Sequence, residues 1–194
     1  MMWSKGKPKT YLWYRLLWWF FLPIVVIRTL IKALHQKDYQ NRFFERLGRV
    51  SSGEYDVMIH AVSVGEAKMA LWLRSQLPAG LKVLFSTTTP TGAGVIMKGK
   101  PQDDRHVFWP WDHAWVVGHW LRHIKFRHLL LLESELWPEM CCQLSAQGVN
   151  IWLVNARLSS RSMKRHQKFP WSINMIKLSI SGVYPESEQS AKRF

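Results

Sequence analysis

Two glutamates follow a run of four leucines in "LLLLESELWP" (129–138), with no turn residue between them. Four consecutive leucines indicate a strand buried on both faces, as in the middle of a parallel sheet. Glu133 and Glu135 are two residues apart, so in extended chain both project to the same side just beyond the strand. Two such carboxylates repel each other unless they bind hydroxyl groups or cations, or share a proton. We therefore expect a binding role for this pair, with Trp137 beside it as an apolar platform for a sugar ring.

A third carboxylate, Glu66, follows an earlier strand pattern within "SVGEA" (63–67). The small residues Ser63 and Gly65 form a turn that places Glu66 at the opening of a helix, where backbone N–H groups stabilise an anion. Such a carboxylate would tend to stay ionised and could accept a proton as a general base. Glu66 is equally well explained as a favourable first-turn residue, and the spacing does not separate the two interpretations.

The stretch "TTTPTGAG" (87–94) resembles an anion-binding turn. Thr89 and Thr91 supply hydroxyl groups, Pro90 suits the first position of a helix, and Gly92 permits a close approach. The stretch lacks the lysine of a Walker loop and the glycine pattern of a dinucleotide site, so neither nucleotide cofactor is implied. An ordinary capped helix start explains it about as well.

Two further clusters carry weaker signals. Arg157 and Arg161, four residues apart at the start of a helix, could clamp a phosphate or a carboxylate, although solvated arginines are the commoner case. His119 and His123 share one helix face and His128 follows, but no acid or cysteine joins them at the spacing of metal ligands. We predict no metal site.

Strand and helix patterns alternate from residue 55 onward, which places these side chains at the ends of strands. Strands separated by helices of this length form βαβ units, so we predict an α/β fold: a Rossmann-like parallel sheet with helices on both faces. Ligands of such sheets collect at the carboxyl ends of the strands, so the stretches above and "WPWD" (109–112) form one candidate site. The predicted strands are 55–62, 81–87, 106–110, 128–134, 150–156 and 177–182, and helices include 65–77, one from about Pro90 and one from Pro185.

The formal net charge of +14 is concentrated at the two ends of the chain. Residues 1–49 carry ten Lys or Arg against two acids and residues 156–194 carry eight against two, whereas the stretch between them has nine of each. A basic, aromatic-rich end indicates either nucleic acid or an anionic membrane surface as partner. The apolar start of the chain favours the membrane, and we predict no nucleic-acid partner.

The start of the chain is typical of a membrane-anchoring helix. Its uncharged run, Leu16 to Ile27, has twelve residues, which as a helix span roughly 18 Å against roughly 30 Å for the hydrocarbon core. Arg15 and Arg28 could extend the reach, but Pro23 would kink a straight span. We therefore expect an interfacial or half-inserted anchor rather than a full span. No small-residue cleavage site follows, so a removed signal peptide is not expected.

Two adjacent cysteines, Cys141 and Cys142, indicate the compartment. A disulfide between neighbours is strained and rare, so a secreted disulfide scaffold is not expected. We interpret both as buried, small hydrophobic residues of a helix in a cytosolic chain.

The motifs together resemble a known family. "HAVSVGEA", "STTTPTGAG", "PWD", "LLLLESELWP", "NARLSSRS" and "SEQSAKRF" come in the order and approximate spacing found in the N-terminal half of bacterial 3-deoxy-D-manno-octulosonic acid (Kdo) transferases. "RFFERLG", after the basic hydrophobic start, resembles that family's membrane-anchoring lead-in. The resemblance implies a GT-B architecture, with two Rossmann-like domains and the active site between them. It also implies transfer of Kdo from CMP-Kdo to the lipid A precursor at the cytoplasmic face of the inner membrane.

The resemblance assigns roles to individual residues. Glu66 matches the family's proposed general base, which would take the proton from the attacking sugar hydroxyl. No metal and no other cofactor is implied. The residues expected to contact the acceptor are Ser63, Gly65, Thr89, Pro90, Thr91, Gly92, Glu133, Glu135, Trp137, Arg157 and Arg161.

We expect two parts: a membrane-anchoring lead-in (1–49) and a Rossmann-like acceptor domain (50–194). Members of the family are much longer, and the C-terminal half that resembles a CMP-Kdo site is expected to be absent. The expected partners are the lipid A precursor and an anionic membrane surface, with CMP-Kdo only if a C-terminal domain is supplied. Alone, the chain should bind acceptor or membrane with little turnover. The alternative is a non-catalytic, membrane-bound lipid A binding module.

Overall fold

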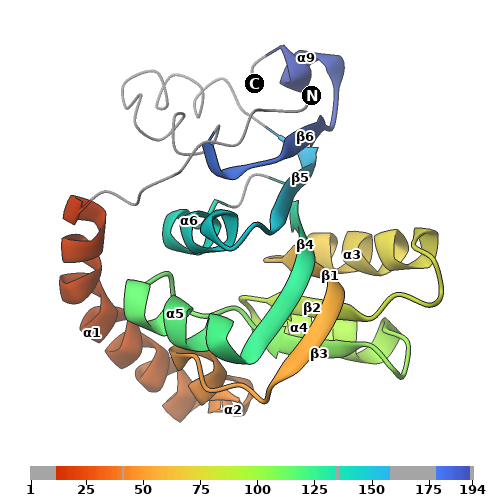
Figure 1. The fold of residues 1–194 in the computed structure, drawn as a ribbon. Coiled ribbons are helices and arrows are strands. Elements are labelled where there is room, and N and C mark those ends of the chain that lie inside the picture. Colours follow the sequence, from red (N-terminus) through yellow and green to blue (C-terminus); the bar gives the residue numbers. More distant parts are fainter. Residues whose placement is uncertain (1–11, 41, 134–135, 158–177, 193–194) are drawn as a thin grey trace.

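The computed structural model describes residues 12–40, 42–133, 136–157 and 178–192 of the 194-residue chain. Its centre is a six-stranded sheet in the order β3-β2-β1-β4-β5-β6, with every neighbouring pair parallel (Figure 1). This is the strand order of a doubly wound Rossmann-like sheet, which confirms the predicted fold class. The strands are β1 (Gly53–Ala61), β2 (Val83–Thr87), β3 (Arg105–Phe108), β4 (Ile124–Leu132), β5 (Asn150–Ala156) and β6 (Gly182–Pro185).

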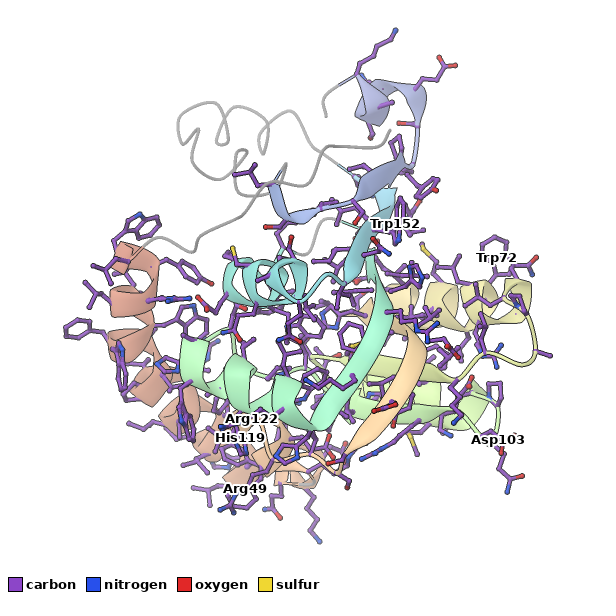
Figure 2. All side chains as sticks on the ribbon, in the orientation of Figure 1. Arg49, Trp72, Asp103, His119, Arg122 and Trp152 are labelled. Atoms are coloured by element: carbon purple, nitrogen blue, oxygen red, sulfur yellow. The ribbon has the colours of Figure 1, made fainter. Side chains whose placement is uncertain are left out.

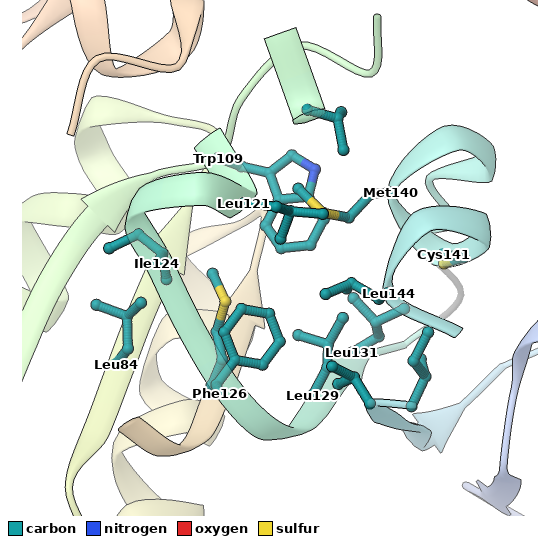
Figure 3. Close-up of a cluster of buried hydrophobic side chains, with 14 of the residues drawn as sticks. Leu84, Trp109, Leu121, Ile124, Phe126, Leu129, Leu131, Met140, Cys141 and Leu144 are labelled. Carbon is teal, nitrogen blue, oxygen red and sulfur yellow. The ribbon is translucent and has the colours of Figure 1, made fainter. Parts of the chain in front are cut away.

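Helices cover both faces of the sheet, as predicted. The helices α3 (Val64–Gln76) and α4 (Pro90–Gly99) pack on one face, and α5 (Ala114–His123) and α6 (Pro138–Ala146) pack on the other (Figure 1). The four leucines are divided between the two apolar clusters. Leu129 and Leu131 join the α5–α6 cluster, which Figure 3 shows, while Leu130 and Leu132 join the α3–α4 cluster. Because β4 is buried on both faces, its apolar run is continuous rather than alternating.

The last two predicted elements are misplaced. The strand predicted at 177–182 lies later, at 182–185, and residues 178–179 have a helical backbone. The helix predicted from Pro185 begins after Ser187, whose Oγ accepts a hydrogen bond from the backbone N–H of Ser190 at 3.2 Å. Pro185 ends the edge strand instead, a position that tolerates its missing N–H. The serine cap, and not the proline, therefore starts α9 (Glu188–Ala191).

The chain begins with a long apolar helix, α1 (Leu12–His35), followed by α2 (Lys37–Gln40) and the short 3₁₀ helix η1 (Phe43–Leu47). The helix α1 continues through Pro23, and its 24 residues span roughly 36 Å, which exceeds the uncharged run considered above. Among the described residues it is the one helix long and apolar enough to cross a membrane. Length and hydropathy alone do not separate a full span from the interfacial anchor that we predict.

The first turns of α1 are attached to the domain by polar contacts. The Tyr14 hydroxyl donates to Asp112 Oδ2 at 2.7 Å, and the Arg15 guanidinium donates to both carboxylate oxygens of Glu139 at 2.8 and 3.0 Å. Glu139 is fully buried, whereas the Arg15 side chain is half-exposed. Most large apolar side chains of α1 remain exposed: Leu12, Trp13, Leu16, Leu17, Trp19, Phe20, Phe21, Ile24, Ile27, Leu30, Ile31 and Leu34.

The Arg15–Glu139 pair yields a stability prediction. Arg15→Ala should lower the free energy of unfolding by about 2 kcal/mol, because it leaves the buried Glu139 carboxylate without its cation. Arg28→Ala, on the exposed surface of the same helix, should change it by less than about 0.5 kcal/mol. Urea unfolding of both variants in detergent measures the difference. Equal effects of the two substitutions would show that the pair does not hold α1 in place.

Candidate active site

The carboxyl ends of the strands meet at one edge of the sheet. Ala61 at the end of β1 lies opposite Thr87 of β2, which in turn lies opposite Phe108 of β3. On the other side, Leu132 at the end of β4 lies opposite Val154 of β5. The loops predicted from the sequence to form the candidate site therefore lie at the same edge of the sheet. The strand order reverses between β1 and β4, and in sheets of this kind the ligand crevice lies outside that point.

Glu66 lies just after β1, at this reversal point. Ser63 Oγ accepts from the Glu66 backbone N–H at 3.2 Å, and Glu66 Oε1 accepts from the Ser63 N–H at 3.1 Å, which is a capping box. Glu66 Oε2 accepts from the Val62 N–H at 2.8 Å, and the residue is only 4% exposed. The first-turn interpretation of Glu66 is thus confirmed. A carboxylate offers about four acceptor positions, so this one retains capacity for a sugar hydroxyl.

Glu133 lies just after β4, on the other side of the reversal point. Its φ of 58° is left-handed, and its N–H donates to the carbonyl of Val154 at 3.0 Å. The strand therefore ends at Leu132, and the extended geometry predicted for Glu133 and Glu135 is wrong at Glu133. A turn of this kind re-aims the side chain at the end of a strand. Glu135 lies outside the described residues, so the predicted pairing of the two glutamates remains a prediction.

The Glu66 carboxylate acts electrostatically on Glu133 across the reversal point. Burial raises the pKa of Glu133, and the nearby Glu66 carboxylate raises it further, while the Arg157 guanidinium acts in the opposite direction. The described part of this edge therefore brings together two carboxylates from the loops after neighbouring strands. This arrangement suits the binding of hydroxyl groups and the transfer of a proton.

Thr89 joins the start of α4 to the loop of Glu66. Its Oγ1 donates to the carbonyl of Val62 at 2.8 Å and accepts from the Gly92 N–H at 3.2 Å. Pro90 occupies the first position of the helix, as predicted. A Cβ on Gly92 would come within 3.0 Å of Thr89 Oγ1, so the glycine permits this close approach. The capped-helix interpretation accounts for these contacts without a bound anion.

The remaining predicted residues contribute less to the described geometry. Gly65 and Thr91 are exposed in the first turns of α3 and α4, on the same edge. Arg157 is exposed after β5 and forms an ion pair with Glu186 at 3.2 Å. Arg161 lies outside the described residues, so the proposed clamp of two arginines is not tested.

A pocket of about 270 Å³ lies at this edge, between α1 and the ends of the strands. Thr89 and Trp137, both predicted from the sequence, line it. Trp109, from the predicted "WPWD" stretch, lines it too, as do Lys32 and Arg46, which sequence reasoning missed as site residues. Lys32 and Arg46 both come from the lead-in, far along the chain from the strand ends, and no local motif connects them to the sheet.

A larger pocket, of about 740 Å³, lies at the opposite end of the sheet. It is lined by the loop before β2 and by the buried ion pair of Arg74 and Asp104, whose Nε–Oδ2 distance is 2.6 Å. Parallel sheets bind ligands at the carboxyl ends of their strands, so we assign the candidate site to the smaller pocket and the adjoining loops.

Asp112, in the "WPWD" stretch, is a structural residue rather than a side chain facing a ligand. It is fully buried, and its Oδ1 accepts from the Met140 N–H at 2.8 Å. Its Oδ2 accepts from the Glu139 N–H at 2.9 Å and from the Tyr14 hydroxyl at 2.7 Å. Burial raises the pKa of Asp112 to about 7, while these hydrogen bonds act in the opposite direction. Asp112, in the loop after β3, thus caps the first turn of α6 and binds Tyr14 at the start of α1.

Of the histidines considered for a metal site, His119 and His123 lie on α5 and His128 lies in β4. The rings of His119 and His123 are 5.1 Å apart, and the Arg122 guanidinium lies 2.9 Å from His119 Nδ1 (Figure 2). The positive charge of Arg122 beside the His119 ring disfavours a metal cation at that ring. In the described ranges, no group of three or more His, Cys, Asp or Glu side chains comes together. Cys141 and Cys142 are both buried, as interpreted above, and no disulfide joins them.

Comparison with known proteins decides the family. Residues 41–194 match the family described as 3-deoxy-D-manno-octulosonic-acid transferase (kdotransferase). The chain belongs to the Kdo transferase family. This agrees with the resemblance that the motifs suggested. The motifs "SVGEA" and "LLLLESELWP" both fall within the matched range.

Individual Kdo transferases are similar over nearly the whole of this chain. The 3-deoxy-D-manno-octulosonic acid transferase of Haemophilus influenzae is 27% identical over 179 residues, which are 89% of this chain and 42% of that protein. A probable mitochondrial transferase of the same kind from Arabidopsis thaliana is 28% identical over 87% of this chain and 39% of its own length. The transferase of Rickettsia bellii is 28% identical over 93% and 44%. The chain thus spans about two fifths of the length of these Kdo transferases.

The coupling of the two carboxylates in this Kdo transferase chain can be measured. Glu66→Gln should lower the pKa of Glu133, because it removes the like charge that favours the protonated form of Glu133. Glu54→Gln, at the exposed start of β1, should leave the pKa of Glu133 unchanged. Carbon-13 NMR titration of the Glu133 carboxyl group measures both variants. An unchanged titration in Glu66→Gln would mean that the two groups do not interact.

Proposed function

We propose that this chain is the acceptor-binding part of a Kdo transferase. It binds the lipid A precursor at the cytoplasmic face of the inner membrane and presents a sugar hydroxyl to CMP-Kdo. Residues 1–49 act as the membrane lead-in and residues 50–194 as the acceptor domain. The observation that carries the proposal is the position of Glu66, after β1 at the reversal point of a sheet that belongs to this family.

In the proposed reaction Glu66 is the general base. Its carboxylate takes the proton of the acceptor hydroxyl while the hydroxyl oxygen attacks the anomeric carbon of Kdo. The bond from that carbon to the phosphate oxygen breaks, and CMP leaves with the electron pair. Two backbone N–H groups, those of Val62 and Ser63, hold the carboxylate in place, which restricts the geometry of the proton transfer. The donor nucleotide is held by a separate C-terminal domain.

The other predicted residues position the acceptor in this proposal. Ser63, Thr89 and Glu133 offer hydroxyl and carboxylate groups to the sugar hydroxyls at the same edge. Trp137, at the start of α6, offers an apolar ring face. The exposed apolar side chains of α1 bind the bilayer, and the basic lead-in is attracted to anionic headgroups.

One observation favours the second candidate, a membrane-bound lipid A binding module without catalysis. Glu66 is nearly buried, and its carboxylate already accepts two backbone hydrogen bonds within a capping box. A residue with this structural role does not need to be a base. The two candidates differ in whether turnover depends on the carboxylate.

A transferase assay separates the candidates. The chain is purified in detergent and tested with CMP-Kdo and a lipid A precursor, alone and joined to the donor half of the Haemophilus influenzae relative. We expect acceptor binding without turnover for the chain alone, and turnover for the joined protein. Glu66→Gln should reduce the turnover number by about 10²–10⁴-fold, the usual contribution of a general base.

Two controls accompany this assay. Glu54→Gln should retain full turnover, because Glu54 is exposed at the opposite end of β1. The thermal midpoint of Glu66→Gln should fall by only a few degrees, which would separate loss of the base from loss of the cap. Acceptor binding by the joined protein without turnover would favour the binding module. Turnover by the chain alone would contradict the assignment of the donor site to a separate domain.

A further inference from the structure

The pocket between α1 and the strand ends contains a buried cation. Arg46, in η1, is 5% exposed, and its guanidinium lies over the Phe108 ring at 4.0 Å. Its Nη1 donates to the carbonyl of Thr88 at 2.8 Å, the one hydrogen bond of this side chain among the described residues. Burial lowers the pKa of Arg46 to about 10, so the guanidinium is still charged at neutral pH. A guanidinium has five N–H donors, and most of them here have no described acceptor.

The neighbouring Glu45 carboxylate favours the charged form of Arg46 but forms its direct ion pair with Arg42. Glu45 is held by the Arg42 guanidinium through two hydrogen bonds, at 2.6 and 2.8 Å, and it also accepts from the Phe108 N–H at 2.8 Å. Within the described ranges, Arg46 forms no ion pair with any carboxylate. Buried charges in proteins are normally paired, because an isolated charge loses its hydration. Among the described residues, the Arg46 guanidinium therefore has room for a further anion beside it.

A second cation lies at the same pocket. Lys32, on the exposed surface of α1, lines the pocket, and its Nζ lies 5.4 Å from the centre of the Tyr39 ring. The described residues that line the pocket include no Asp and no Glu. Two cations without an acid favour a ligand group with more than one negative charge.

The walls of the pocket carry polar atoms that have no hydrogen-bond partner among the described residues. Trp109 is 2% exposed, within the cluster of Figure 3, and its Nε1 is one of these atoms. Thr88 Oγ1 and Trp137 Nε1 are likewise buried with no partner in the described part of the chain. All three residues line the pocket, and the indole rings of Trp109 and Trp137 are 6.1 Å apart. Aromatic walls beside cations are typical of sites that bind a sugar together with an anionic substituent.

We propose that this pocket is a phosphate-binding site, in which Arg46 and Lys32 hold the phosphate and the indole walls contact the group that bears it. At about 270 Å³ the pocket has room for a phosphorylated sugar or for the phosphate of a phospholipid headgroup. Assigning the ligand to the phosphate of the lipid A precursor rests on the proposed function. Phosphate binding itself rests only on the pocket.

Indole NMR of the full chain in detergent tests this proposal. The protein is labelled with ¹⁵N-tryptophan and titrated with inorganic phosphate, glucosamine 1-phosphate and unphosphorylated glucosamine. The Nε1–H signals of Trp109 and Trp137 should shift with the two phosphates and not with glucosamine. The signal of Trp72, which is exposed on α3 away from α1, should stay constant (Figure 2).

Matched lysine variants show whether the cations are responsible. Lys32→Ala should weaken binding of glucosamine 1-phosphate about tenfold, the equivalent of one charge-assisted contact. Lys98→Ala, which removes an exposed lysine near the end of α4, should leave it unchanged. Arg46→Gln should abolish the shifts, but Arg46 is buried and this variant can unfold, so Lys32→Ala decides. Equal shifts with glucosamine and its phosphate, or no effect of Lys32→Ala, would overturn the proposal.

A second arm identifies the source of the phosphate. Bicelles containing phosphatidylglycerol replace the sugar phosphate. Tighter binding of the sugar phosphate supports a phosphorylated glycolipid as ligand, whereas shifts that saturate only with the bicelles support an ordinary phospholipid headgroup. If the protein binds phosphate but has no transferase activity, the phosphate-site proposal stands and only the proposed function is rejected. If turnover is normal but phosphate does not bind, only the phosphate-site proposal is rejected.

Discussion

The Asp112 carboxylate is the contact on which the edge of the sheet depends. It lies in the loop after β3, and its two oxygens accept hydrogen bonds from the first turn of α6 and from Tyr14 of α1. Three segments that are distant in sequence therefore meet at one fully buried side chain. Its burial is unfavourable to the charged form, and the three donors counteract that effect. Without this carboxylate, the first turn of α6, which follows Trp137, would lose the acceptor of two of its N–H groups, and the start of α1 would keep only the Arg15–Glu139 pair among the polar contacts described above.

The edge has two regions of opposite charge. Glu66 and Glu133 lie on either side of the point where the strand order reverses, after β1 and β4. Arg46 and Lys32 lie at the pocket between α1 and the strand ends, beside Trp109. A sugar hydroxyl suits the first region and an anionic substituent suits the second. One phosphorylated sugar could satisfy both, which would fix the orientation of its reacting hydroxyl.

The sequence predicted what depends on local pattern. The alternation of strand and helix patterns was enough to predict the parallel sheet. The continuous leucines of β4 were enough to predict a strand buried on both faces. Glu66 could be found because its loop has a recognisable helix start. The turn at Glu133 was missed because a left-handed residue directly after a buried strand leaves no composition signal. Arg46 was missed, and Asp112 was expected at the site but not as a structural residue, because their roles come from partners distant along the chain.

The attachment of α1 has a consequence for how an acceptor would be found. Tyr14 and Arg15 fix the first turns of the helix to α6 and its neighbouring loop, while Lys32, five turns later, reaches the pocket. The first turns of the helix are thus attached to the domain, and a later turn borders the pocket at the sheet edge. If the exposed apolar side chains of this helix lie on a bilayer, the sheet edge is kept close to the headgroups. A lipid-borne sugar would then reach it by lateral diffusion in two dimensions, without leaving the membrane.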